Sequence, residues 1–128
     1  MSTNQEVLFA DECYKLVGAA FEVYNELGSE FLEQVYQEAY EFELNSNSIP
    51  FVSQPPLHIT YKGHTLNKEY FADLIAYHEI LIELKAIEKL TKREESQILN
   101  YLRASNLRLG ILINFGHDQK LEWKRIIR

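Results

Sequence analysis

Apolar residues recur at helical spacing in three segments of the chain, which predicts three amphipathic helices. These segments are residues 8–27, 29–45 and 91–106. Gly28 fits the end of the first helix, while Ser29 and Thr91 fit the N-terminal caps of the second and third. The side chains expected to face the core are Val17, Ala20, Phe21, Tyr24, Leu27, Leu32, Val35, Tyr36, Ala39, Ile98 and Leu102.

Short segments with strand character lie between the second and third helices and after the third. They are residues 51–54, a hairpin over 57–70 that turns at Lys62-Gly63, two apolar strands within 71–86, and further strands at 109–115 and 120–128. Because a helix joins the strand that holds Glu83 to the strand LGILINF, these two strands are expected to be parallel. The order of elements predicts an α/β sandwich, with a central mixed sheet flanked by helices.

Three ionisable residues interrupt the most apolar strands, in the segment FADLIAYHEILIELKA. Glu83 and Lys85 share one face because side chains alternate along a strand. If residues 77–79 form a three-residue loop, Asp73 lies opposite Glu83, with Cβ atoms roughly 4.5–5.5 Å apart. Carboxylates that close repel each other, which raises the pKa of one of them or calls for a cation between them.

A hard divalent ion such as Mg²⁺ would resolve this repulsion with one or two carboxylates plus water and a phosphate. Lys85 could then hold an anionic substrate or polarise the attacking water. The same spacing is equally compatible with a structural arrangement. In that alternative, Lys85 pairs with a carboxylate in the core, or the three charges reach solvent at the strand ends.

Two helices offer further polar side chains. Gln97 and Tyr101 are one turn apart on the third helix and would reach the carboxylates or a phosphate if that helix covers the sheet. The alternative is an ordinary boundary row with a packed tyrosine. Glu33 borders the apolar stripe of the second helix beside Tyr36, and taken alone it reads as a solvated glutamate.

Three segments of the chain resemble a known family. They are ELGSEFLEQVYQEAYEFEL, YFADLIAYHEILIELKAIEKLTKREESQILNYLRASNLRLGILINFG and KLEWKR. Together they resemble the GxxExxY family of small bacterial proteins, which is classed with the PD-(D/E)XK nuclease-like superfamily. The resemblance covers residues 14–125 and implies a restriction-endonuclease-like fold in a single domain over residues 1–128.

The resemblance also implies a site. The superfamily's motif-2 aspartate falls on Asp73, its E-x-K element on Glu83 and Lys85, and its helix-borne glutamine on Gln97, which Tyr101 follows. The early helical glutamate falls on Glu33, the E of the signature whose Y is Tyr36. The implied metal is Mg²⁺ or Mn²⁺, held by Asp73, Glu83, the carbonyl of Leu84 and Glu33. One departure is that Glu30 occupies the signature's glycine position, with Gly28 two residues earlier.

The implied activity is metal-dependent hydrolysis of phosphodiester bonds in nucleic acid, with DNA as the first expectation. The alternative is a non-catalytic binding or regulatory module that keeps the nuclease fold. The net charge of −6 argues against tight non-specific binding of nucleic acid, which rests on many phosphate contacts. The stretches KLTKREE and KLEWKR nevertheless hold much of the positive charge.

The composition of the chain excludes several other classes of protein and site. The one cysteine, Cys13, excludes an internal disulfide, and the four histidines lack the spacing of a zinc site. The first residues show no secretory signal, and no apolar run approaches the length of a membrane span. We therefore expect a cytoplasmic protein without a membrane partner. A homodimer is left open by Trp123 and the aliphatic residues near it.

Overall fold

The computed structural model describes residues 8–128. The helices are α2 (Ala10–Leu27), α3 (Glu33–Ser46) and α4 (Lys92–Ser105). The strands are β1 (Phe51–Ser53), β2 (Pro56–Tyr61), β3 (His64–Phe71), β4 (Leu74–Ala76), β5 (Ile80–Lys85), β6 (Leu109–Asn114) and β7 (Glu122–Ile127).

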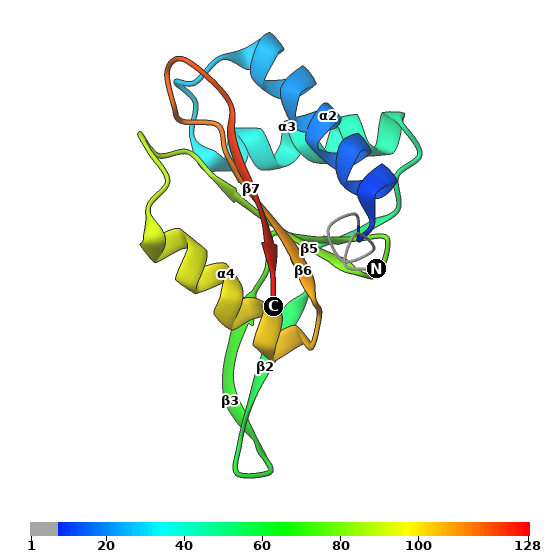
Figure 1. The fold of residues 1–128 in the computed structure, drawn as a ribbon, viewed down its shortest axis with the longest axis vertical. Helices are drawn as coiled ribbons and strands as arrows, with labels where there is room; N and C mark the ends of the chain where they lie inside the picture. Colours follow the sequence, from blue (N-terminus) through cyan, green and yellow to red (C-terminus); the bar gives the residue numbers. More distant parts are fainter. Residues whose placement is uncertain (1–7) are drawn as a thin grey trace.

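Five strands form a central sheet in the order β1-β4-β5-β6-β7. Helices α2 and α3 cover one face of this sheet and α4 covers the other, while the hairpin β2–β3 projects beyond it (Figure 1). Strand β5 pairs in parallel with β6 and antiparallel with β4. The predicted α/β sandwich and the predicted parallel pair are therefore confirmed.

The second helix begins later than the predicted cap at Ser29. Helix α3 starts at Glu33 after an N-cap at Leu32 that makes no side-chain hydrogen bond. The chain before it wraps around Tyr36, whose hydroxyl donates to the carbonyl of Gly28 and accepts from the N–H of Phe31 at 3.3 Å. These contacts hold residues 28–31 out of the helix, so the predicted cap is wrong.

The apolar row of α3 also differs from the predicted stripe. Its fully buried side chains are Tyr36, Tyr40 and Leu44, which follow one another at intervals of four residues. Leu32 and Val35 are 75% and 38% exposed. The tyrosines can replace aliphatic residues in the core because each hydroxyl finds a backbone carbonyl, and that of Tyr40 donates to Leu16 at 2.9 Å.

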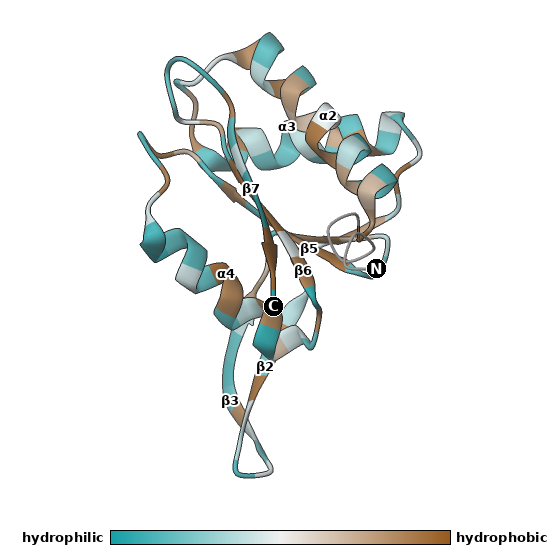
Figure 2. Ribbon diagram, viewed as in Figure 1, coloured by the Kyte–Doolittle hydropathy of each residue, from teal (hydrophilic) through white to brown (hydrophobic). Residues whose placement is uncertain are grey.

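Side chains of β5 alternate between two hydrophobic clusters. Ile80, Ile82 and Leu84 pack into the cluster that includes side chains of α2 and α3. Leu81 packs into the cluster that includes side chains of α4. Figure 2 shows the central strands as hydrophobic and the first turns of α4 as hydrophilic. Because the strand period is two, Glu83 belongs to the face that α4 covers.

Helix α4 begins at the predicted cap. The Thr91 hydroxyl accepts from the N–H of Arg93 at 3.2 Å, and the Glu94 carboxylate accepts from the N–H of Thr91 at 2.7 Å. This reciprocal arrangement is a capping box, which satisfies two N–H groups that the helix leaves free. The cap fixes where α4 begins, and therefore which of its side chains lie over the end of β5.

The hairpin also turns where the sequence predicts. Tyr61 pairs with His64 across a two-residue turn at Lys62 and Gly63, whose φ angles are 50° and 81°. Positive φ at both central residues suits the right-handed twist of a hairpin.

Within residues 8–128, no helix has the length and apolar character that a membrane crossing requires.

Candidate functional site

Two carboxylates meet where β4 and β5 pair. Leu74 lies opposite Ile82 and Ala76 opposite Ile80, so the same register places Asp73 opposite Glu83. The backbone N–H of Asp73 donates to Oε2 of Glu83 at 2.9 Å. The N–H of Leu84 donates to Oδ2 of Asp73 at 2.6 Å. Each carboxylate is therefore fixed to the backbone of the other strand.

The surroundings of this pair disfavour two negative charges. Glu83 is 4% exposed, and burial, followed by the charge of Asp73, raises the pKa of Glu83 to about 8. Burial also raises the pKa of Asp73 to about 6, although the hydrogen bond from Leu84 opposes this increase. Because both pKa values are raised, the pair favours a protonated form, and a bound cation would favour the ionised form of both carboxylates.

Lys85 lies one step along the same face, and its charge opposes the rise in pKa of both carboxylates without a direct ion pair. Its Nζ donates to Oε1 of Gln97 at 2.7 Å. Within residues 8–128 it forms no ion pair with Asp73 or Glu83. The alternative reading of a structural ion pair is therefore not what the structure shows. The ammonium is held beside the carboxylates by an uncharged partner from α4.

Tyr101 lies one turn after Gln97 and completes the polar side of α4. Burial raises the pKa of Tyr101, and the charges of Glu83 and Asp73 raise it further. Its phenol thus lies within electrostatic reach of both carboxylates, as expected if α4 covers this face of the sheet. The structure brings Asp73, Glu83, Lys85, Gln97 and Tyr101 together at one end of β5.

Glu33 stands apart from this group. It is the first residue of α3, it is exposed, and its charge raises the pKa of both Asp73 and Glu83. Among the described residues, however, no group of three or more His, Cys, Asp or Glu side chains is arranged to hold a metal ion. Glu33 therefore lies within electrostatic reach of the pair without joining it as a third direct ligand.

The oxygens of the pair still suit a hard cation. Within the described part of the chain, no hydrogen bond reaches Oδ1 of Asp73 or Oε1 of Glu83. No buried polar side-chain atom there lacks a partner, so both of these oxygens are in contact with solvent. Two accessible carboxylate oxygens fit Mg²⁺ or Mn²⁺, because Mg²⁺ usually keeps several waters and takes one or two carboxylates.

Leu84 contributes through its backbone. Its side chain is fully buried in the cluster that includes α2 and α3, and its N–H binds Asp73. An apolar residue fits between Glu83 and Lys85 because its side chain faces the opposite side of the sheet from theirs and only its backbone reaches the pair. The Leu84 side chain packs towards α2 and α3, while the side chains of Glu83 and Lys85 lie on the face that α4 covers.

Tyr36 fixes the backbone that leads into α3, beside the site. Its ring stacks on Phe115, with centroids 4.6 Å apart and planes 2° from parallel. Its hydroxyl binds the backbone on both sides of the turn between α2 and α3, at Gly28 and Phe31. The tyrosine of the E-x-x-Y spacing therefore fixes the start of α3, where Glu33 lies.

Two further residues near the site, Gln37 and Asn114, are not among those predicted from the sequence. The side-chain amide of Gln37 donates to the carbonyl of Asp73 at 3.0 Å, which ties α3 to the end of β4. Asn114 is fully buried beside Lys85 and makes four hydrogen bonds, two of them to the backbone of Ile87. An asparagine within the apolar run LGILINF is the signal that could have indicated it.

Charge is unevenly divided between the two sides of the sheet. Residues 10–46, which include α2 and α3, hold nine Asp and Glu against one lysine. Residues 47–128 hold twelve Lys and Arg against nine Asp and Glu. The negative net charge therefore comes mainly from the segment that holds α2 and α3, of which Glu33 acts on the pKa of the carboxylate pair.

Comparison with known proteins gives a family and a fold. A family model described as the PD-(D/E)XK nuclease superfamily matches residues 10–126. The crystal structure of SSO0001 superposes with a TM-score of 0.62 at 19% sequence identity, over 74% of this chain and 49% of that one. At that identity the likeness shows the fold, and this chain spans about half of the SSO0001 chain. No curated protein matches the sequence.

Proposed function

Since the chain belongs to the PD-(D/E)XK nuclease superfamily, we propose that it hydrolyses phosphodiester bonds in nucleic acid, with DNA as the first substrate to test. The observation that carries this proposal is the pairing of Asp73 with Glu83 beside the ammonium of Lys85, which is hydrogen-bonded to Gln97. Within the superfamily, the E-x-x-Y spacing of Glu33 and Tyr36 favours the GxxExxY group.

Nucleases of this superfamily generally use divalent metal ions, and the residues present fit one. Asp73 and Glu83 would hold Mg²⁺ or Mn²⁺ through their accessible oxygens, with the carbonyl of Leu84 in reach and Glu33 contributing through water. When bound, such an ion offsets charge on the phosphate and lowers the pKa of water. A bound cation would also favour the ionised form of both carboxylates.

The remaining residues orient the reaction. Lys85 would direct the attacking water or stabilise the charge that develops on the phosphate, and Gln97 holds its Nζ at 2.7 Å. Gln97 and Tyr101 present an amide and a phenol from α4 on the side where the phosphate would lie. We assign these two residues to positioning of the phosphate.

The test is cleavage of labelled single-stranded, duplex and branched DNA and of RNA, with Mn²⁺ or Mg²⁺ and with EDTA. We expect metal-dependent cleavage that Lys85→Ala reduces by at least about 100-fold, because general acid-base groups contribute on that order. Lys89→Ala removes an exposed lysine from the loop after β5 and is the matched control. Its rate should equal that of the wild type.

One observation favours a second candidate, a nuclease-fold module that binds without turnover. The described residues hold no group of three metal ligands. The same assay separates the two functions. If no substrate is cleaved with either ion and Lys85→Ala behaves as the wild type, the catalytic proposal is wrong and the binding module is the better account.

A further inference from the structure

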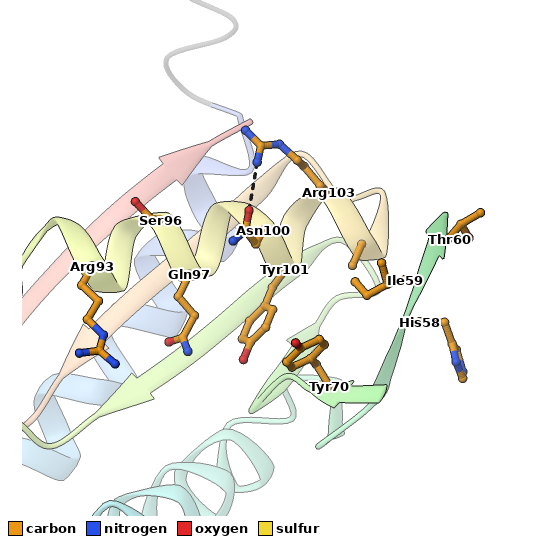
Figure 3. A pocket seen from close by; sticks show the side chains of 11 residues that line it. His58, Ile59, Thr60, Tyr70, Arg93, Ser96, Gln97, Asn100, Tyr101 and Arg103 are labelled. Carbon is orange, nitrogen blue, oxygen red and sulfur yellow. Dashed lines mark hydrogen bonds between the residues drawn. The ribbon is translucent and has the colours of Figure 1, made fainter. Parts of the chain in front are cut away.

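A groove runs between α4 and the hairpin β2–β3, with a volume of about 760 Å³. One wall carries Arg93, Gln97 and Tyr101, which are spaced four residues apart and project from the same side of α4 (Figure 3). The facing wall carries Tyr70 of β3, whose ring lies 5.9 Å from that of Tyr101 at 44°. With Arg103 and Asn100, the lining therefore combines two guanidinium groups, two side-chain amides and two aromatic rings.

This groove is continuous with the candidate site. Gln97 lines it and also accepts the hydrogen bond from Lys85 at 2.7 Å. Tyr101 lines it and lies near the carboxylate pair, as described above. A chain-like ligand whose phosphate reached Lys85 would extend into the groove, with its next units against Arg93 on one side of Gln97 and Tyr101 on the other.

The lining favours an anion with a flat apolar part. None of the described residues that line the groove is acidic, and Arg93 forms no ion pair within residues 8–128. Nε2 of His58, which lines the groove, lies 3.4 Å from Oε2 of Glu69. Tyr70 is 42% exposed, so part of its ring is free for contact.

We propose that this groove binds a single strand of nucleic acid beside the cleavage point, with one base against Tyr70 and a backbone phosphate at Arg93. A base can stack on a tyrosine ring when its own face is free, and within a duplex that face is covered by neighbouring bases. The groove volume is that of a small-ligand pocket, which suits one or two nucleotides rather than a double helix.

The inference rests on the proposed function, since it takes the substrate to be nucleic acid. An exposed tyrosine alone would be ordinary on a protein surface. Here the ring faces a second tyrosine across a groove, and Gln97, the middle residue of the row on α4, accepts a hydrogen bond from the proposed catalytic lysine.

The experiment measures binding without cleavage. The full chain is titrated in EDTA against a fluorescent 12-nucleotide single strand, a duplex and an RNA of the same sequence, with anisotropy as the signal. The variants are Tyr70→Ala, Tyr70→Phe and Arg93→Ala. Tyr14→Ala is the control because Tyr14 is 82% exposed on α2, in the acidic layer. Circular dichroism melting confirms that each variant is folded.

We expect single strands of DNA or RNA to bind more tightly than the duplex. Tyr70→Ala should weaken that binding by about tenfold or more, as removal of a stacking platform does, while Tyr70→Phe keeps it. Arg93→Ala should weaken binding and reduce the slope of affinity against salt by about one contact. Tyr14→Ala should stay within about twofold of the wild type.

Equal affinities of Tyr70→Ala and Tyr14→Ala, tighter binding of the duplex, or no binding of any strand would each overturn the inference. The experiments test this inference separately from the proposed nuclease activity. Tyr70-dependent binding without cleavage in Mn²⁺ supports the groove and removes the catalytic proposal. Cleavage without any effect of Tyr70→Ala on binding leaves the nuclease standing and removes the groove.

Discussion

The buried glutamate of the pair makes a prediction about folding that requires no knowledge of the substrate. Glu83 is 4% exposed and its pKa is raised from 4.5 to about 8, first by burial and then by Asp73. In the unfolded chain it ionises near its ordinary value. Between these two pH values the folded protein binds a proton that the unfolded chain does not.

The sign of the effect follows from that difference. Stability rises with pH where the unfolded state binds more protons, and here the folded state binds more, so the metal-free protein loses stability as pH rises from about 4.5 through 8. Each pH unit of pKa difference corresponds to 1.36 kcal/mol. For Glu83 the loss is therefore about 3–5 kcal/mol, most of it complete by pH 8.5.

Glu83→Gln removes the charge and keeps the shape. The side-chain oxygen of glutamine can still accept the hydrogen bond that the N–H of Asp73 now donates to Oε2 of Glu83. We expect the variant to match the wild type at pH 5 and to exceed its free energy of unfolding by about 3–5 kcal/mol at pH 8.5. Urea unfolding in EDTA at intervals of one pH unit measures this difference.

Glu38→Gln is the control, because Glu38 is an exposed glutamate of α3. Its effect should stay within about 0.5 kcal/mol at every pH, as for most surface substitutions. A constant difference between wild type and Glu83→Gln across the pH range would refute the reasoning. Marked destabilisation of the variant at pH 8.5 would mean that Glu83 is charged and stabilised by a partner.

Two further results are expected. The affinity for Mn²⁺, measured by calorimetry, should rise between pH 6 and pH 8 because the ion must displace the proton of the pair. Asp73→Asn should abolish most of the binding heat. A binding heat that changes neither with pH nor with Asp73→Asn would mean that the ion binds elsewhere. Asn114→Leu should lower the free energy of unfolding in urea by about 2–4 kcal/mol, because it leaves the N–H and carbonyl of Ile87 without partners. A loss below about 1 kcal/mol would show that water replaces the amide.

The register of β4 and β5 could be predicted because it depends on local features. Two apolar strands separated by three residues leave few pairings, and the side-chain period of two then fixes which face holds Asp73 and Glu83. Tyr77 and His78 adopt φ angles of 55° and 64° in the loop. The cap of α4 was equally local, since Thr91 and Glu94 are three residues apart.

Other features depend on contacts between distant parts of the chain. The start of α3 is set by Tyr36, which packs on Phe115 and binds the backbone of the preceding turn, so the propensity of Ser29 to cap a helix is overridden. Gln37 reaches Asp73 across 36 positions. Hydrophobic periodicity carries no information about such polar contacts, because each depends on how α3 packs against the sheet.

The net charge of the whole chain does not describe the charge around the groove, because electrostatic interactions at physiological salt extend about 8 Å. A phosphate at Lys85 would meet the side of the sheet where α4 and the hairpin lie, whereas nine of the carboxylates belong to residues 10–46 in the layer across the sheet. In that layer Glu33 and Glu41 raise the pKa of Asp73, whereas none of the described residues that line the groove is acidic. An acidic chain can thus present one favourable approach, and here that approach leads to Arg93, Lys85 and the carboxylate pair.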